Sequence, residues 1–359
     1  MPRPHLALGV TEGNPCLIAP GAVPALFERW RDALAGLRPR YLRVLIVWSR
    51  LQPHRDRPPD WTEPADGCLR GAQPCFPFNG VRDELRAASA AGLQVVVTIL
   101  ATPTWAAGPA TGCERDDTKP SSRAPADLDA YRALVRSLLA EGRREGADLR
   151  WWSAWNEPNH PAFFNPQRAG CTKGAPPRAA QRYADLVRAV HAELDAAPGE
   201  QHVVLGETAA LRTSTTTTTA AADFARELPR DVVCSAGVWA EHAYVGVRHR
   251  LAGADDPDAV LRDVENALAA RDCPNGPPPV WITETGVAAG SGTEGCRDLG
   301  RALRAWGADP RVEAAFQYTF REDDAFPVGL ADAELRALRP AYAAWRAAAD
   351  GAPGGASAC

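Results

Sequence analysis

The chain has 359 residues, of which 45% are hydrophobic and 23% charged, and this balance excludes a disordered or fibrous protein. The formal net charge of −4 argues against nucleic acid or an anionic membrane as the main partner. In addition, the sequence holds no apolar stretch of the ~18 residues that a membrane-spanning helix needs.

Short apolar runs, rich in β-branched and aromatic residues, recur along the chain and predict eight strands. They are residues 5–10, 41–48, 93–100, 149–156, 203–206, 236–244, 280–284 and 313–320. Between them, segments of helical period predict helices, of which the longest are 81–91, 128–144, 181–197, 258–270 and 299–306.

Strands that alternate with helices predict parallel pairing through right-handed crossovers, and at this length the sheet is expected to close as a (β/α)8 TIM barrel, an α/β fold. An open doubly wound sheet is the alternative, but no GxGxxG segment follows the first strand, so a dinucleotide site is not supported. We expect a single domain over residues 1–350 and a disordered C-terminal tail over 351–359. Three Pro/Gly-rich stretches, 53–77, 108–125 and 165–177, follow strands and are expected to form the loops that build the active site.

Two glutamates stand where predicted strands end. In the first segment, Trp155-Asn156-Glu157-Pro158-Asn159, the strand is expected to end at Asn156, because Pro158 cannot continue a ladder. In the second, Ile282-Thr283-Glu284-Thr285-Gly286, an apolar strand also ends on a carboxylate. By their order these are strands four and seven of the barrel, so Glu157 and Glu284 are expected to face each other across its mouth.

A pair of carboxyl groups on either side of one bond is what glycoside cleavage requires. One group must be protonated to assist the leaving oxygen, and the other must be ionised to attack the anomeric carbon or to stabilise its positive charge. A single glutamate at a strand end is commonly just a solvated residue, but two on separate strands, one of them between Asn and Pro, favour the catalytic interpretation.

These two segments resemble glycoside hydrolase clan A, the retaining (β/α)8 glycosidases, and most closely the cellulase-like family 5 and the family 39 type. The resemblance extends over about residues 6–345. It implies that Glu157 is the acid/base and Glu284 the nucleophile, and that Asn156 binds the 2-hydroxyl of the sugar.

The same resemblance implies roles for three further residues. His242 and Tyr244 match a His-x-Tyr pattern whose Tyr contacts the nucleophile, and Arg43 matches an arginine that supports it. An arginine and a tyrosine hydroxyl both favour an ionised carboxylate, whereas an apolar wall and a second negative charge favour a protonated Glu157. The alternatives are that Arg43 pairs with any strand-end carboxylate, and that His242 and Tyr244 form structural hydrogen bonds. The chain departs from the family 5 pattern at residues 316–320, where the usual tryptophan under the sugar is missing.

Other residues near predicted strand ends are candidates for binding a sugar. Trp48 and Trp105 could stack on the apolar face of a sugar ring, and Trp105 is the preferred platform. The alternative for these indoles is core packing, which we expect for the helical Trp30, Trp306 and Trp345. Glu12 and Glu207 could bind sugar hydroxyls.

The chain has nine cysteines, with no spacing typical of a zinc site, so disulfides and an oxidising compartment are expected. On the predicted barrel, plausible pairs are Cys68–Cys75, Cys113–Cys171, Cys234–Cys273 and, as a guess, Cys16–Cys296. The sequence begins with no signal peptide, so a secreted or cell-surface protein would be a trimmed mature form. A cytosolic protein with buried thiols is the alternative.

Together these features predict a retaining glycosidase that cleaves a β-linked oligosaccharide, polysaccharide or glycoside. We expect no metal and no cofactor, a carbohydrate as the partner, and a monomer. A carbohydrate-binding barrel without catalysis and a transglycosylase are the competing hypotheses.

Overall fold

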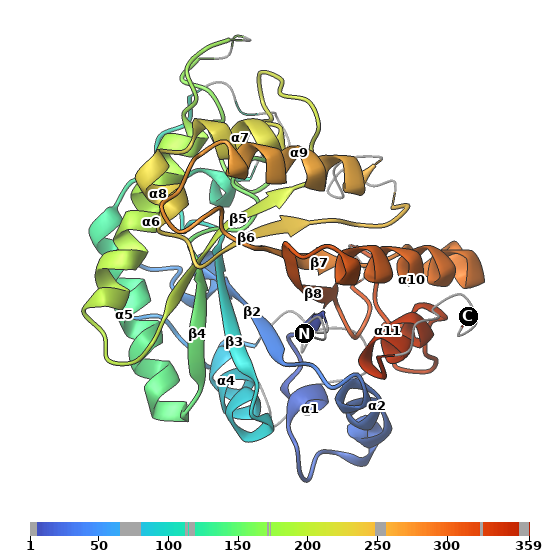
Figure 1. Ribbon diagram of the computed structural model, residues 1–359. Coiled ribbons are helices and arrows are strands. Elements are labelled where there is room, and N and C mark those ends of the chain that lie inside the picture. Colours follow the sequence, from blue (N-terminus) through green and yellow to red (C-terminus); the bar gives the residue numbers. More distant parts are fainter. Residues whose placement is uncertain are drawn as a thin grey trace.

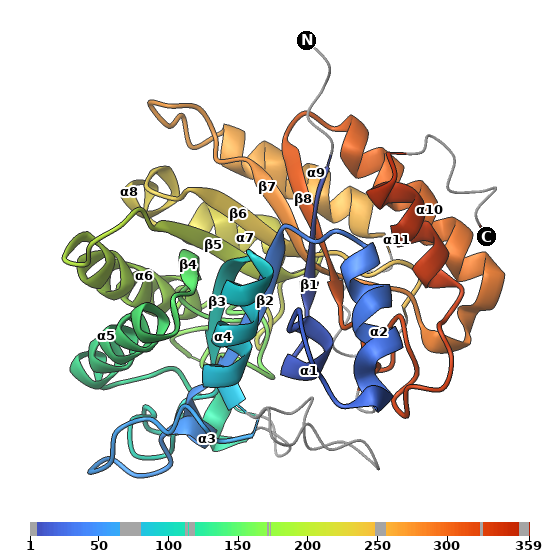
Figure 2. The same ribbon diagram turned by 90° about the horizontal axis from the view of Figure 1, so that it is seen from below.

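The computed structural model describes residues 6–64, 80–111, 114, 119–170, 172, 174–247, 256–323, 326–351 and 359. Eight parallel strands form a closed barrel in the order of the chain, with the last strand paired to the first. Helices surround this barrel on its outside (Figures 1 and 2). The predicted single-domain (β/α)8 architecture is therefore confirmed.

The strands are β1 (Ala7–Thr11), β2 (Tyr41–Val47), β3 (Gln94–Leu100), β4 (Asp148–Ser153), β5 (His202–Ala209), β6 (Val238–His242), β7 (Val280–Thr285) and β8 (Val312–Tyr318). The α-helices are α1 (Pro15–Ile18), α2 (Ala25–Gly36), α3 (Trp48–Leu51), α4 (Gly80–Ala91), α5 (Leu128–Glu145), α6 (Ala179–Asp195), α7 (Ala221–Glu227), α8 (Arg230–Cys234), α9 (Pro257–Ala269), α10 (Gly292–Ala308) and α11 (Ala341–Ala349). Three-residue 3-10 helices are η2 (Pro120–Ser122) and η3 (Ala289–Ser291). None of the helices among the described residues is both long and apolar enough to span a membrane.

Alternating strand residues separate the two layers of the core. One buried cluster contains Tyr41, Val204, Ala240 and Trp281 and fills the inside of the barrel. Their neighbours in the strands belong to the larger cluster that packs against the helices. The sequence alternation therefore decides which side chains point into the barrel.

Helix α5 shows how the outer layer is held. The Asp127 side chain accepts a hydrogen bond from the Ala130 N–H, which caps the first turn, and the helix ends at Gly146, whose φ is +68°. Its buried face includes Tyr131, whose hydroxyl donates to the Ala154 carbonyl oxygen at 2.6 Å. This contact ties the helix to the segment that follows β4.

Several boundaries differ from the prediction. Strand β4 ends at Ser153 rather than at residue 156, so Asn156 and Glu157 lie in the segment after the strand. Strand β2 ends at Val47, and Trp48 begins the short helix α3. Strand β6 ends at His242, so Tyr244 follows it. In each case the residues leave the ladder sooner than apolar composition alone suggests.

Two disulfides join described cysteines. Cys234 is bonded to Cys273, as predicted. The guessed pair of Cys16 with Cys296 is wrong, because Cys296 bonds Cys359 across 63 residues of chain and Cys16 is buried in the core. Cys68, Cys75, Cys113 and Cys171 lie outside the described residues.

Candidate active site

The predicted glutamates and their partners meet at the ends of strands in the barrel. Arg43 comes from β2, Glu207 from β5, His242 from β6 and Glu284 from β7. Asn156, Glu157 and Tyr244 lie in segments that directly follow β4 and β6. Because all strands are parallel, the segments that follow them share one end of the barrel, where α/β barrels carry their active sites.

Irregular strand pairing turns two of these glutamates inward. On β5 the pairing with β6 shifts between Gly206 and Thr208, so Glu207 is the extra residue of a bulge. On β7 the pairing with β6 and with β8 shifts next to Glu284. Strict alternation from the inward-facing Val204 and Trp281 would point Glu207 and Glu284 towards the helices. The bulges are thus the local reason that both carboxylates reach the centre.

The backbone around the site adopts conformations that L-residues rarely occupy. Glu157 has φ +41° and Glu207 has φ +52°, and the Glu157 N–H donates to the Glu207 carbonyl oxygen at 2.9 Å. Beside them, Gly206 has φ +93°, and a Cβ there would lie 2.7 Å from the Ala240 carbonyl oxygen. Such strain is commonly held in place by the structure at functional sites.

Arg43 is fully buried and binds three of the site residues. Its Nη1 donates to Glu284 Oε1 at 2.7 Å, and its Nη2 donates to Glu207 Oε2 at 2.6 Å. The same Nη2 donates to Asn156 Oδ1 at 2.8 Å. One guanidinium therefore fixes the positions of two carboxylates and of the amide that precedes Glu157.

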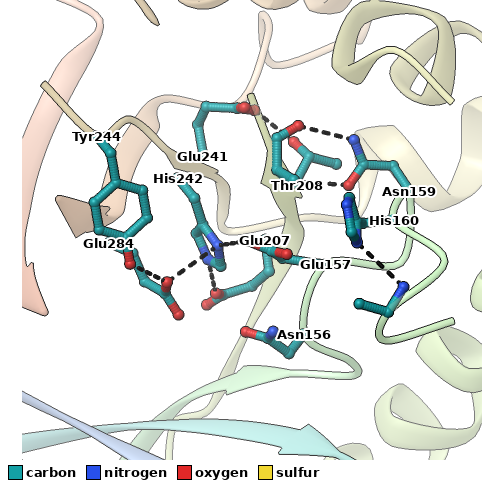
Figure 3. Close-up of polar contacts among 12 residues, drawn as sticks. Asn156, Glu157, Asn159, His160, Glu207, Thr208, Glu241, His242, Tyr244 and Glu284 are labelled. Atoms are coloured by element: carbon teal, nitrogen blue, oxygen red, sulfur yellow. Dashed lines mark hydrogen bonds and ion pairs between the residues drawn. The ribbon is translucent and has the colours of Figure 1, made fainter. Parts of the chain in front are cut away.

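His242 stands between three glutamates. Its Nδ1 lies 2.8 Å from Glu157 Oε1 and 3.4 Å from Glu284 Oε2, and its Nε2 lies 2.7 Å from Glu207 Oε2 (Figure 3). Glu284 Oε2 also accepts a hydrogen bond from the Tyr244 hydroxyl at 2.5 Å. The contacts that the resemblance implied for Arg43 and Tyr244 are therefore present, and His242 adds a direct contact with Glu157.

The environment gives Glu157 a high pKa. Burial raises the pKa of Glu157 to about 7, and the charge of Glu284 raises it as well, while His242 and Arg43 oppose them. Only Oε1 of Glu157 is bonded to His242; Oε2 is buried and has no hydrogen-bond partner among the described residues. Glu157 can thus hold a proton near neutral pH, and one of its oxygens is not engaged by a described residue.

For Glu207 and His242 the shifts favour the charged form: the pKa of Glu207 is lowered and that of His242 is raised. Burial opposes the charge of Glu207, but the charge of Arg43 and the His242 bond outweigh it and lower the pKa of Glu207 to about 2. Burial likewise opposes a charged His242, yet Glu284 and the bonds to Glu157 and Glu207 raise the pKa of His242 to about 10. The cluster therefore places Arg43 and His242 against three carboxyl groups.

Three residues of the site also carry atoms of the kind that metal ions bind. Glu157, His242 and Glu284 each offer a ligand atom, and these atoms lie within 4.8 Å of one another. In this structure these atoms contact one another directly, with His242 Nδ1 beside Glu157 Oε1 and Glu284 Oε2, so the three residues form a hydrogen-bonded cluster.

The other predicted binding residues fall in different places. Glu207 is fully buried and Glu12 nearly so; Glu12 accepts hydrogen bonds from the N–H groups of Asn14 and Arg321. Trp48 is fully buried against Trp105 and Tyr131, so its expected role as a sugar platform is corrected to core packing. Glu207 is likewise corrected from a sugar ligand to an internal partner of Arg43 and His242, because no part of it is exposed.

Trp105 is partly exposed, and its indole N–H donates to the Gln52 carbonyl oxygen at 3.0 Å. A cavity next to Arg43 is lined by Glu12 from the end of β1 and by Tyr318 from the end of β8. The ring of Tyr318 packs against the rings of Tyr244 and Phe326. Tyr318 was missed as a site residue; its only signal was the aromatic position at the end of the eighth strand.

No protein-family model matches the sequence, and none of the curated proteins is similar to it. Many solved structures share its fold. A GH5_18 from Bifidobacterium longum subsp. infantis has 18% identity and a TM-score of 0.62, and the match covers 97% of this chain and 79% of that one.

Two further structures extend the comparison. A GH5_18 from Streptomyces cattleya in complex with GlcNAc has 20% identity and a TM-score of 0.57, covering 97% of this chain and 80% of that one. The glycoside hydrolase family 30 subfamily 8 xylanase Xyn30A from Clostridium acetobutylicum has 16% identity and a TM-score of 0.55, with 96% and 72% covered. At these identities the likeness shows a shared fold, the (β/α)8 barrel of these glycosidases, in agreement with the resemblance to clan A.

Proposed function

We propose that the protein is a retaining glycoside hydrolase, with Glu284 as the nucleophile and Glu157 as the acid/base. The observation that carries this proposal is the meeting of the two glutamates, since an oxygen of Glu157 and one of Glu284 lie within 4.8 Å of each other. Retaining enzymes hold their two carboxyl groups ~5–5.5 Å apart, whereas inverting enzymes need ~6.5–9.5 Å to admit a water molecule. The approach of one oxygen from each group to within 4.8 Å is compatible with the shorter spacing and supports double displacement.

In the first step, Glu284 attacks the anomeric carbon while Glu157 protonates the oxygen of the departing group. The glycosidic C–O bond breaks, and an ester bond forms between the sugar and Glu284. In the second step, Glu157, now a carboxylate, takes a proton from water, whose oxygen attacks the anomeric carbon and releases Glu284. Each step returns Glu157 to the protonation state that the next one needs.

The surroundings of each glutamate suit its proposed role. Arg43 and Tyr244 donate short hydrogen bonds to Glu284 and so stabilise its carboxylate. Burial keeps a proton on Glu157, whose Oε2 has no hydrogen-bond partner among the described residues and is proposed to donate that proton to the leaving oxygen when a substrate is bound. Asn156, held by Arg43 through Oδ1, would present its amide nitrogen to the sugar 2-hydroxyl.

The substrate is proposed to be a β-linked glycoside that enters beside Arg43. The cavity lined by Glu12, Arg43 and Tyr318 is proposed to receive a part of the substrate other than the bond that breaks, because neither Glu157 nor Glu284 is among its lining residues. Tyr318 would form its aromatic wall in place of the missing tryptophan. Trp105 remains a second candidate platform. The two disulfides support a location outside the cytoplasm, and a monomer is the expected state.

The test is a panel of aryl β-glycosides and oligosaccharides, with products separated by chromatography and the anomer of the first product followed by NMR. We expect hydrolysis with a β-configured first product, and losses of ~10²–10⁴-fold in kcat for Glu157→Gln and more for Glu284→Gln. Glycan binding without turnover would favour the binding barrel, and transfer to added sugars without hydrolysis would favour a transglycosylase. Activity that survives both substitutions would overturn the proposal.

A further inference from the structure

Glu207 has no role in the proposed reaction, yet its carboxyl group contacts both Arg43 and His242. Its Oε2 lies 2.6 Å from Arg43 Nη2 and 2.7 Å from His242 Nε2, and its Oε1 accepts weaker bonds from Arg43 Nε and Thr98 Oγ1, each at 3.4 Å. The side chain is fully buried, so Glu207 cannot bind a sugar. Any effect of Glu207 on the reaction would therefore act through Arg43 and His242.

Arg43 and His242, the two residues that the Glu207 carboxyl group contacts, also contact the proposed catalytic pair. Arg43 contacts Glu284, and His242 contacts Glu157 and, at longer range, Glu284. The Glu207 main chain contributes as well, because its carbonyl oxygen accepts the Glu157 N–H. Glu207 is therefore connected to Glu157 by its side chain through His242 and directly by its backbone.

We propose that Glu207 is a positioning residue that keeps His242 doubly protonated, so that the imidazolium holds Glu157 in place and sets when Glu157 releases its proton. This inference rests on the proposed glycosidase function and deepens it. Each nitrogen of His242 faces a carboxyl oxygen, and only an imidazolium can donate a hydrogen bond through both nitrogens.

The expected effect of removing the Glu207 charge follows from the charges that surround His242. These are Glu157 after β4, Glu207 on β5 and Glu284 on β7, with Arg43 on β2 bound to two of them and Tyr244 bound to Glu284. Glu207→Gln keeps the shape and removes one negative charge. The Glu157–His242 pair would then hold its protons less tightly, because two cations would face only two carboxyl groups.

The kinetic experiment compares pH profiles of kcat/KM for the wild type and Glu207→Gln on a β-glycoside with a poor leaving group. We expect the basic limb of the variant to move to lower pH, a ~10–100-fold lower kcat near pH 7, and little change in KM, since Glu207 does not touch the sugar. With an activated aryl leaving group, which needs no proton, the loss should be smaller. An unmoved basic limb would overturn the proposal.

Two variants separate charge from shape. Glu241→Gln makes the same chemical change at a fully buried glutamate on β6, whose carboxyl group bonds Thr208 and points away from His242 (Figure 3). Its profile should match the wild type below pH 8. Glu207→Asp keeps the charge but shortens the side chain, so kcat should fall while the basic limb stays near its wild-type position; a limb displaced as far as in Glu207→Gln would refute the charge argument.

A measurement on the wild-type protein guards against a variant that does not fold. Histidine labelled with ¹⁵N reports the protonation of each ring nitrogen, and the His242 signals are assigned by their loss in His242→Gln. We expect an imidazolium with two N–H groups at pH 8 in the wild type, and loss of one proton at lower pH in Glu207→Gln. A neutral wild-type ring at pH 8 would refute the inference, whereas an imidazolium in a protein that cleaves no glycoside would refute only the proposed function.

Discussion

Glu157 and Glu284 bring carboxylate oxygens within 4.8 Å of each other, although they come from the segment after β4 and from β7. Two carboxyl groups this close do not ionise independently, because each negative charge raises the proton affinity of the other. Their partners divide the roles: Arg43 and Tyr244 donate to Glu284, whereas Glu157 keeps one oxygen without a described partner.

The pH profile of hydrolysis should have its basic limb near the pKa of Glu157, about 7. Glu157 must be protonated when the leaving group departs, so kcat/KM should fall as the pH rises through that value. Glu157→Gln should remove the limb from the residual activity on activated aryl glycosides. Initial rates from pH 4 to 10 at constant ionic strength would measure it, and a limb that persists in Glu157→Gln would assign it to another group.

Replacing Tyr244 by Phe should slow the reaction by ~10–100-fold, because Glu284 loses a charge-assisted hydrogen bond of 2.5 Å. The change deletes only one hydroxyl, so the fold should persist. Tyr342→Phe is the matched control, since that hydroxyl donates to the Ala33 carbonyl oxygen between α11 and α2, away from the site. Steady-state kinetics of both variants would check the prediction, which fails if the two lose equal activity.

Glu241 should make the protein less stable as the pH rises. Burial raises the pKa of Glu241 to about 8 despite the bond from Thr208, so the folded chain keeps a proton that the unfolded chain loses near pH 4.5. The stabilisation that this proton gives is complete below about pH 4.5 and is lost as the pH rises through about 8.

Glu241→Gln cannot titrate, so its stability relative to the wild type should increase between pH 5 and pH 8, by on the order of a few kcal/mol. Urea unfolding at both pH values would measure this difference, with the exposed Glu28→Gln as the control. Parallel pH dependences for Glu241→Gln and the wild type would show that burial does not hold this proton.

Removing the Cys234–Cys273 disulfide should destabilise the fold without impairing catalysis. The bridge closes 39 residues of chain, and loop-closure entropy for that length predicts about 4 kcal/mol. The two cysteines precede β6 and β7, at the end of the barrel opposite the site. Cys234→Ser combined with Cys273→Ser should therefore unfold at lower urea concentration yet keep its kcat at 25 °C; an equal loss of kcat would indicate coupling between the two ends of the barrel.

The sequence was sufficient for the architecture and for part of the site. Eight apolar runs separated by helical segments leave few economical arrangements other than a closed parallel barrel. Regular alternation also places Arg43 and His242 inside, because Arg43 is two residues after Tyr41 and His242 two after Ala240, both in the inner cluster. The disulfide between Cys234 and Cys273 was predicted from the order of the strands in the same barrel.

Only the tertiary structure decided which way the side chains of two glutamates point. Alternation alone would have turned Glu207 and Glu284 towards the helices, and it is the bulges on β5 and β7, set by pairing with neighbouring strands, that aim them inward. The indole ring of Trp48 could stack on a sugar, but it packs against Trp105 and Tyr131 and lies in the core. Periodicity is a local property that a sequence displays, whereas register shifts and burial depend on contacts between segments far apart in the chain, and these exist only once the barrel has closed.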